Sequence, residues 1–133
     1  MKNMFLFLVS EAVQKYGRQL KEEQEVLAGL ADQIIGIFTA ESVLLRTEKR
    51  KARAESLPGE VEHAAAMTRV FVHETFEQAE LAAKRLLSAM AEGDALRRGL
   101  SVLQHMAQHE PVNTTALKRA IAARVIGAEK YAG

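Results

Sequence analysis

Residues 18–53 have the sequence RQLKEEQEVLAGLADQIIGIFTAESVLLRTEKRKAR, and this stretch decides the fold of the chain. Its apolar side chains recur every three or four residues, which is the spacing of one face of an α-helix. Charged side chains fill positions between them, and no proline interrupts the pattern. We therefore predict one long helix over residues 18–53, whose buried stripe contains Leu27, Leu30, Ala31, Ile34, Phe38 and Leu45.

The same helical period continues on both sides of this stretch. It predicts a short helix over residues 3–16, a long helix from Pro58 to Ala91, and two helices capped by Asp94 and Asn113. Glycine or proline lies in each break between helices, at Gly17, residues 56–59, Gly93 and residues 110–111. The predicted fold is all-α, an up-and-down helical bundle of four main helices plus a short N-terminal helix, in a single domain over residues 1–133.

Each predicted helix carries one apolar face that should point into a common core. The first helix is expected to bury Phe5, Leu8, Val9, Ala12, Val13 and Tyr16. The helix that follows Pro58 is expected to bury Ala64, Met67, Phe71, Thr75, Ala79, Ala82, Leu86 and Met90. The last two helices are expected to bury Leu96, Leu100, Leu103, Ala107, Ile121, Val125 and Ala128.

Composition limits the classes of protein to which the chain can belong. Of the 133 residues, 48% are hydrophobic but only 5% are aromatic, which favours helices over sheets. The net charge of +1 gives no overall field that would attract nucleic acid or an anionic membrane. The absence of cysteine excludes thiolate chemistry and fits a reducing cytoplasm. The apolar run Met4–Val9 is too short for a secretion signal, and no stretch approaches the roughly 20 apolar residues of a membrane span.

No motif predicts an active site within this chain. The eight glycines never have the spacing of a phosphate-binding or dinucleotide loop. Residues 60–63 contain a single Glu-x-x-His, which di-iron bundles use twice and in mid-helix, so we interpret it as a solvated first turn. His105 and His109 share a helix face as paired zinc ligands would, but no third ligand accompanies them. We interpret them as surface histidines near a helix end.

Glu41 is the charged residue that interrupts the apolar stripe of residues 18–53. It lies between Phe38 and Leu45 at helical spacing, so we predict a buried carboxylate with a structural role. Because buried charges are normally paired, the expected partner is Arg69 or His73 on the next helix. A general base is the alternative, but the sequence shows neither a substrate pocket nor a complementary group.

Two surfaces are candidates for contact with partners. The first is a basic cluster at the end of the long helix, where the helix dipole favours cations, and it contains Arg46, Lys49, Arg50, Lys51 and Arg53. An anionic partner, a lipid surface and nucleic acid all stay open for this cluster. The second surface is on the first helix, which Met4, Leu6 and Phe7 make apolar nearly all round. One small bundle cannot cover both sides, so this helix should dock on another surface or on a second copy.

Several stretches of the chain resemble a known family. The chain is similar to the C-terminal extension of bacterial acyl-CoA dehydrogenases related to the very-long-chain enzymes. The similar stretches are Lys15–Leu27, residues 31–35, Glu41–Arg46 and Pro111–Thr114. Some of these relatives have Tyr-Ala-Met-Glu-Ser where this chain has Phe-Thr-Ala-Glu-Ser at residues 38–42. The likeness spans almost the whole chain.

The resemblance implies an extension that follows a flavin-dependent catalytic core and packs over it, where a second dimer docks in shorter tetrameric dehydrogenases. It also implies FAD in the parent enzyme, a role in fatty acid β-oxidation and a dimer. The family's glutamate base, flavin contacts and most of its acyl-CoA pocket lie upstream, so no catalytic, cofactor-binding or metal-binding residue is carried over to this chain. The first helix is then expected to dock on the catalytic core. Mitochondrial relatives link this extension to membrane association, which leaves a membrane surface as a weaker partner for the basic cluster.

The alternative is a free-standing helical interaction module. The last two helices, joined by a turn at Pro111, permit a helix-turn-helix interpretation with Lys118, Arg119 and Arg124 exposed toward DNA. Antiparallel helical hairpins are far commoner than DNA readers, and no aromatic side chain lies among the cations of residues 46–53 to stack on bases. The sequence therefore favours the dehydrogenase extension over a nucleic-acid partner.

Overall fold

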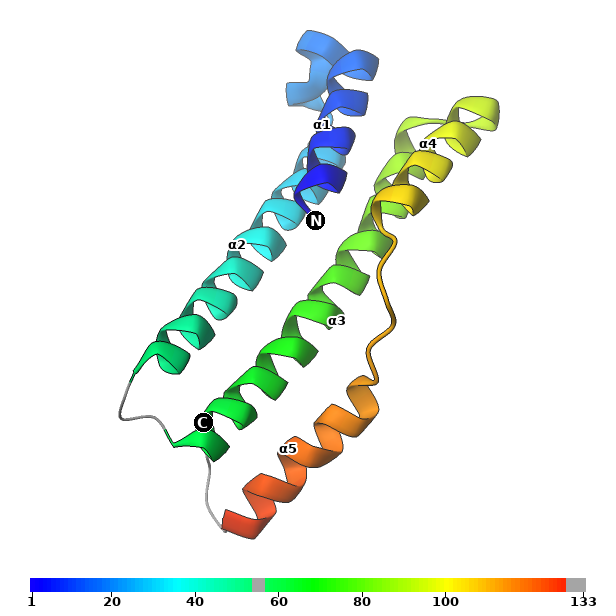
Figure 1. Cartoon of the computed structure of the whole chain (residues 1–133). Coiled ribbons are helices and arrows are strands. Elements are labelled where there is room, and N and C mark those ends of the chain that lie inside the picture. Colours follow the sequence, from blue (N-terminus) through cyan, green and yellow to red (C-terminus); the bar gives the residue numbers. More distant parts are fainter. Residues whose placement is uncertain (54–56, 129–133) are drawn as a thin grey trace. The chain divides into compact units, whose positions relative to one another are not determined.

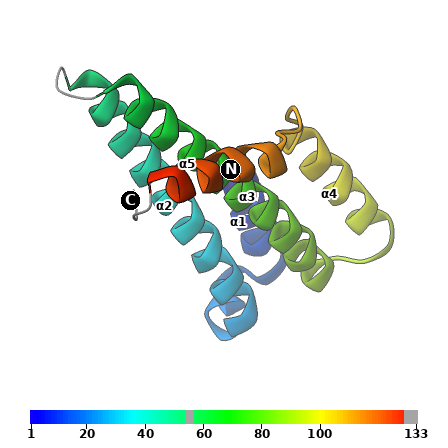
Figure 2. The same cartoon turned by 90° about the horizontal axis from the view of Figure 1, so that it is seen from below.

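The computed structural model describes residues 1–53 and 57–128, and every regular element in these ranges is a helix, as Figure 1 and Figure 2 show. The elements are α1 (Lys2–Tyr16), the 3₁₀-helix η1 (Gly17–Glu22), α2 (Gln24–Ala52), α3 (Pro58–Met90), α4 (Gly93–Met106) and α5 (Thr114–Ala128). The predicted all-α class is confirmed. The up-and-down arrangement of four main helices and the single domain over residues 1–133 stay predictions.

The described helices group into two compact units that do not follow chain order. Unit 1 comprises Met1–Thr39 and Thr75–Glu110, and unit 2 comprises Ala40–Glu74 and the chain from Pro111 onward. Unit 1 therefore contains α1, η1, α4, the first half of α2 and the second half of α3. Unit 2 contains the remaining halves of α2 and α3 together with α5.

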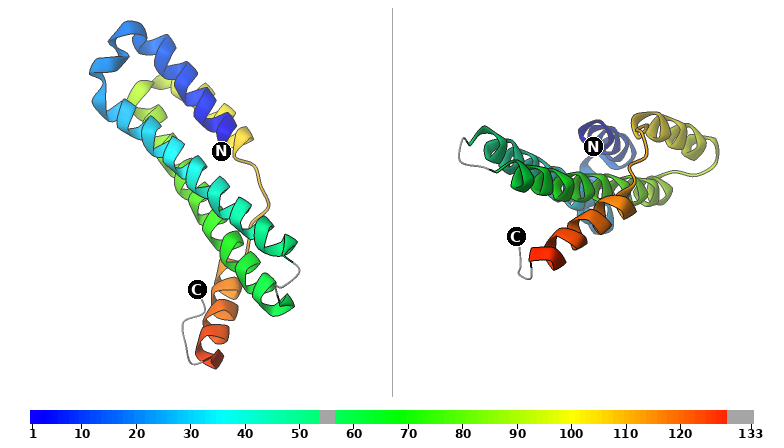
Figure 3. Two further views of the ribbon diagram at one scale, coloured as in Figure 1. Left: turned by 90° about the vertical axis from the view of Figure 1, so that its left-hand side faces the viewer. Right: turned by 60° about the horizontal axis from the view of Figure 1, so that its bottom comes forward.

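Unit 1 has a hydrophobic core that receives side chains from α1, α2, α3 and α4. Its largest fully buried side chains are Met4 and Leu8 from α1, Leu87 from α3 and Leu103 from α4. Both views of Figure 3 show α1 close to α4, and the two helices are in contact. The predicted inward faces of these two helices are confirmed at Leu8, Ala12, Leu103 and Ala107, whereas Val13 is exposed.

Helices in unit 1 approach one another closely where glycine replaces a side chain. A Cβ atom at Gly99 of α4 would lie 2.8 Å from Cδ2 of Leu87 in α3. A Cβ atom at Gly29 of α2 would lie 3.0 Å from Cδ1 of Leu86, also in α3. Because real Cβ contacts are seldom this short, the absence of a side chain at both positions lets the core close.

Buried polar contacts join α2 to α3 within each unit. In unit 1, Nε2 of Gln33 donates a hydrogen bond of 2.9 Å to the carbonyl oxygen of Ala79. In unit 2, the hydroxyls of Thr47 and Thr68 hydrogen-bond to each other. Thr47 also donates to the carbonyl oxygen of Val43 in its own helix, at 3.1 Å. A buried polar group without a partner costs free energy, so these contacts favour one register of α2 on α3.

Within unit 2, polar and charged side chains also join α5 to α3. Nζ of Lys118 lies 2.6 Å from Oε1 of Glu74. The guanidinium of Arg124 lies over Gly59, with Nη1 3.1 Å from where a Cβ atom would be. Contacts at two points along α5 therefore hold this helix against the first half of α3.

Several predicted helix boundaries are confirmed. α1 ends at Tyr16, and Gly17 follows it with a φ of +53° that glycine adopts at little cost. α3 begins at Pro58, where the missing N–H leaves no helical hydrogen bond unmade. Oδ1 of Asn113 accepts a hydrogen bond of 3.0 Å from the backbone N–H of Ala116, so the N-cap of α5 is confirmed. Two predicted details, the break at Ser56 and the side chain of Ala128, lie outside the described residues.

Two predicted helix starts are wrong. The long helix does not begin at residue 18, because the tighter η1 holds Gly17–Glu22 and α2 starts only at Gln24. Asp94 does not cap α4, since Glu92 holds the cap position. Oδ1 of Asp94 instead lies 3.2 Å from Nη1 of Arg97 within the first turn. The i, i+3 ion pair competes with the capping bond for the same carboxylate.

The prediction of which face α2 buries is also wrong. Of the six stripe residues, only Leu30 is buried, and the others are exposed. The side chains that α2 does bury are Val26, Leu30, Gln33, Ala40 and Thr47. Small side chains and hydrogen-bonded polar side chains allow close packing on α3, so the less apolar face of α2 turns inward. Phe71 of α3, also predicted inside, is exposed as well.

The close packing at Gly99 predicts a measurable strain on substitution. We expect Gly99→Ala to lower the free energy of unfolding by about 1–2 kcal/mol, because overpacking against Leu87 outweighs the gain in helix propensity. Gly36→Ala is the matched control in the same unit, since its nearest neighbour, Cγ2 of Thr75, lies at a comfortable 3.6 Å. This control should raise stability by about 0.5–1 kcal/mol. Urea unfolding followed by circular dichroism measures both, and equal stabilisation by the two changes would contradict the packing.

The hydroxyl pair of Thr47 and Thr68 predicts a non-additive double-mutant cycle. Thr47→Val should cost about 1–3 kcal/mol because it leaves the buried Thr68 hydroxyl without this partner. Thr47→Val combined with Thr68→Val removes both groups and should restore most of that loss. Thermal unfolding of the two single variants and the double variant measures the coupling. Losses that simply add would show that the two hydroxyls do not stabilise each other.

Candidate functional site

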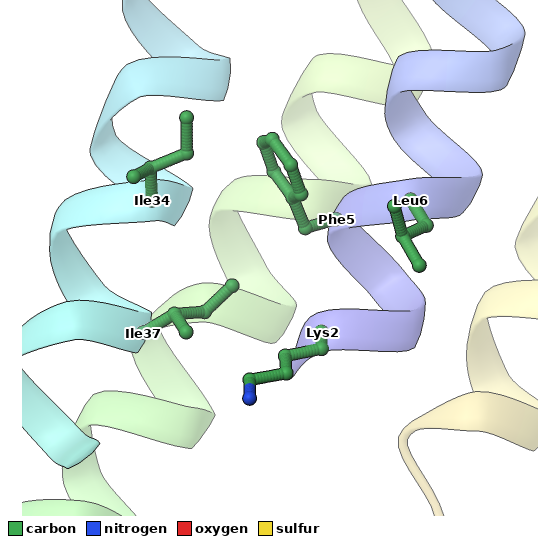
Figure 4. Close-up of a pocket in the computed structure, with 5 residues that line it drawn as sticks. All are labelled: Lys2, Phe5, Leu6, Ile34 and Ile37. Atoms are coloured by element: carbon green, nitrogen blue, oxygen red, sulfur yellow. The ribbon is translucent and has the colours of Figure 1, made fainter.

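An apolar groove runs between α1 and the first half of α2 in unit 1 (Figure 4). Its volume is about 260 Å³, and its lining residues are Lys2, Phe5, Leu6, Ile34 and Ile37. Figure 4 shows the Phe5 ring between the two helices, on the side that faces Ile34. The ammonium of Lys2 is the charged group among these residues. We call this feature the α1/α2 groove.

Large apolar side chains stand exposed at and beside the α1/α2 groove. The exposed fraction is 62% for Leu6 and 51% for Ile34. Next to the groove on α2, Ile35 and Phe38 are exposed by 61% and 71%. Soluble chains seldom leave a contiguous set of large apolar side chains in water unless it contacts another surface. This part of unit 1 is therefore a candidate docking surface.

The structure revises the docking surface predicted on the first helix. Leu6 is exposed, as predicted, but Met4 is completely buried and Phe7 is half-buried against the core of unit 1. The predictions for Met4 and Phe7 are wrong because this chain covers α1 on more than one side. What sequence reasoning missed is the contribution of α2, whose Ile34 and Phe38 were assigned to the core.

The predicted basic cluster lies in unit 2, and all five of its side chains are exposed. Four of them line a hollow of about 470 Å³ together with Ser42 and Leu45. We call this feature the basic hollow, and its lining residues are Ser42, Leu45, Arg46, Lys49, Arg50 and Arg53. Lys51 lies outside it and pairs with Glu48, whose Oε1 is 3.5 Å from the Lys51 ammonium.

Glu41 is exposed, so the prediction that its carboxylate is buried is wrong, whereas its structural role stays a prediction. The prediction followed from placing Glu41 inside the apolar stripe, and that stripe itself faces outward. An exposed carboxylate needs no buried partner, and its replacement by leucine should not leave an uncompensated charge in the core. The pairing of Glu41 with Arg69 or His73 stays a prediction.

The histidines follow the surface interpretation only in part. Glu60 and Glu62 are exposed, but His63 is buried, so residues 60–63 are not solvated throughout. The ring of His109 packs edge-on to Phe76, with 4.7 Å between ring centroids. His105 is exposed in the last turn of α4. Within the described ranges, no three metal-binding side chains come together.

The cations of the proposed DNA-reading helix are partly engaged elsewhere. Lys118 forms its ion pair with Glu74, and Arg124 lies over Gly59. Both contacts hold α5 on α3 within unit 2, so these side chains serve packing between two helices. The DNA-binding alternative receives no support from this arrangement.

One described helix, α2, is long and apolar enough to cross a membrane by length and composition alone. Its most apolar 18-residue window has a mean hydropathy of 1.4. The expectation that no stretch approaches a membrane span is therefore wrong by this measure. The high mean hydropathy of α2 comes from its exposed apolar face. The opposite face of α2 packs against α3 through Gln33 and Thr47.

Comparison with known proteins places these surfaces in a larger context. Residues 1–105 match the protein family described as acyl-CoA dehydrogenase, C-terminal domain. The chain is 41% identical over 132 residues to a probable acyl-CoA dehydrogenase of Bacillus subtilis (strain 168), covering 98% of this chain and 22% of that protein. It is similar to the crystal structure of acyl-CoA dehydrogenase complexed with FAD from Bacillus anthracis, with a TM-score of 0.86 and 38% identity over 98% of this chain and 22% of that one.

The chain thus spans about a fifth of the length of these two relatives. The family match covers α1 to α4 nearly completely, and both relatives agree with it in sequence or in fold. The chain belongs to the acyl-CoA dehydrogenase C-terminal domain family.

Proposed function

We propose that this chain is the C-terminal helical domain of an FAD-dependent acyl-CoA dehydrogenase that acts in fatty acid β-oxidation. In this proposal, the domain packs against the catalytic core, and the rest of the enzyme performs the chemistry. Support comes from the family match and from two relatives, each of which extends for about four-fifths of its length beyond the region matched by this chain.

The observation that carries the proposal is the exposed apolar surface around the α1/α2 groove. Leu6, Ile34 and Phe38 each expose half or more of their side-chain surface. Burying one such side chain contributes roughly 1.5–3 kcal/mol, so leaving several exposed is a substantial cost for a chain that acts alone. We infer that the catalytic core covers this surface.

The flavin is proposed to be bound upstream of this chain. Many dinucleotide sites use a glycine-rich turn that presents backbone N–H groups to the pyrophosphate at a helix start. The two glycines with positive φ, Gly17 and Gly93, belong to no such turn. The α1/α2 groove offers mainly aliphatic and aromatic side chains to a ligand. The described residues therefore do not fit FAD.

Further features of the parent enzyme belong to the same proposal. The resemblance to the very-long-chain type supports a long acyl substrate and a homodimer, since the domain would fill the place of a second dimer. The absence of cysteine supports a cytoplasmic enzyme. An up-and-down bundle formed by residues 1–133 as one domain would give the core a rigid surface to pack on. For the basic cluster, a membrane surface is a weaker candidate partner than the catalytic core is for the domain.

A joint-production experiment tests the proposal. The chain is produced alone and, as a separate polypeptide, together with the catalytic core that lies upstream of it in the proposed enzyme, and flavin absorbance and acyl-CoA-dependent reduction of an artificial electron acceptor are measured. We expect a colourless, inactive chain alone and a yellow, active joint product. Leu6→Glu combined with Ile34→Glu should abolish co-purification, because two carboxylates would be buried in an apolar contact.

The control variant carries Ser101→Glu and Gln104→Glu, which add the same two charges to an exposed face of α4. It should co-purify like the parent chain, and circular dichroism should show both variants folded. A chain that binds flavin by itself, or an upstream product that is neither yellow nor active, would contradict the proposed function.

A further inference from the structure

The basic hollow lies on one face of the last part of α2, within unit 2. Its lining residues are separated by three positions or by one, from Ser42 to Arg53, which keeps them on one side of the helix. The backbone N–H of Arg53 donates a hydrogen bond of 3.2 Å to the carbonyl oxygen of Arg50. Arg53 therefore continues the helical path just beyond Ala52, and four cations border the same volume.

The helix dipole explains only part of this cluster. Its attraction for cations falls off within the last turn, which in α2 contains Lys49, Arg50 and Lys51. Arg46 lies outside that turn, yet it borders the hollow. The position of Arg46 therefore needs another explanation.

The four cations of the hollow also repel one another. Arg46 precedes Arg50 by four positions, and Lys49 precedes Arg53 by four, a spacing at which like charges destabilise a helix. Arg46, Lys49 and Arg53 form no ion pair with any residue in the ranges that the structure describes. Lys51, outside the hollow, is paired with Glu48. A bound anion would offset the charges of Arg46, Lys49 and Arg53.

We propose that the basic hollow binds a soluble ligand that carries two or more phosphate groups. Guanidinium groups bind phosphate oxygens through paired hydrogen bonds, and the three cations Arg46, Lys49 and Arg53 suit more than one negative charge. The hollow has a volume of about 470 Å³. Leu45 gives the hollow an apolar wall for the organic part of such a ligand. The proposal does not rest on the dehydrogenase assignment.

Calorimetric titration of the 133-residue chain with inorganic tripolyphosphate tests this proposal. We expect one ligand per chain, with a Kd that rises about tenfold when the salt concentration increases from about 50 to about 300 mM. Arg46→Gln combined with Lys49→Gln should raise Kd by about tenfold or more, because charge-assisted hydrogen bonds to phosphate are lost. Both side chains are exposed, and circular dichroism verifies that the variant folds.

The matched control combines Lys51→Gln with Arg98→Gln, which removes the same net charge at exposed positions outside the hollow. Its Kd should stay within about twofold of the parent value at the higher salt concentration. Equal weakening in both double variants, or several ligands per chain, would overturn the site in favour of unspecific charge attraction. Binding to phosphatidylglycerol vesicles without binding to tripolyphosphate would overturn it in favour of a lipid surface.

Discussion

The fold depends on how closely α2 can approach α3. In unit 1, Gly29 faces Leu86 at the distance of a tight contact, and Gln33 reaches the backbone of Ala79. In unit 2, the hydroxyls of Thr47 and Thr68 meet between the same two helices. Small side chains give up apolar area, but they allow the helices to pack at short distance and to satisfy their buried polar groups. Close packing on α3 determines which face of α2 points inward, and most of the large apolar side chains of α2 are therefore exposed.

This choice has a direct consequence for function. If α2 packed its leucines and isoleucines inward, its outer face would be polar. The chain could then act as an independent domain. The observed α2 instead presents Ile34, Ile35 and Phe38 to the outside, and α1 adds Leu6 to the same surface. Such a surface is what a domain needs if it is to pack against a larger protein. The family to which the chain belongs and the greater length of its relatives fit this arrangement.

Helix existence could be predicted from the sequence, but helix orientation could not. The 3.6-residue period, Gly17, Pro58 and Asn113 located most elements, because these signals act within one or two turns. The direction that α2 faces depends on α3, which lies far along the chain, and on whether a partner covers its apolar stripe. Apolarity alone cannot distinguish a core from a docking surface. The apolar pattern therefore predicts Phe38 in the core and a buried carboxylate at Glu41, whereas both side chains are exposed. The spacing of Gly29, Gln33, Ala40 and Thr47 carried the missing signal, since small and hydrogen-bonding residues favour close helix packing.

Phe38 is 71% exposed in the chain, and we propose that it is covered in the complete enzyme. Because the sequence contains no cysteine, Phe38→Cys introduces a single reactive thiol. Ser101→Cys, on an exposed face of α4, is the reference. The rate of thiol labelling can be measured for both variants in the chain alone and in the complete dehydrogenase. The account predicts that Cys at position 38 reacts rapidly in the chain alone and about tenfold or more slowly in the enzyme, because a covered site must open before it reacts. Equal labelling rates in the two forms, with the reference unchanged, would contradict it.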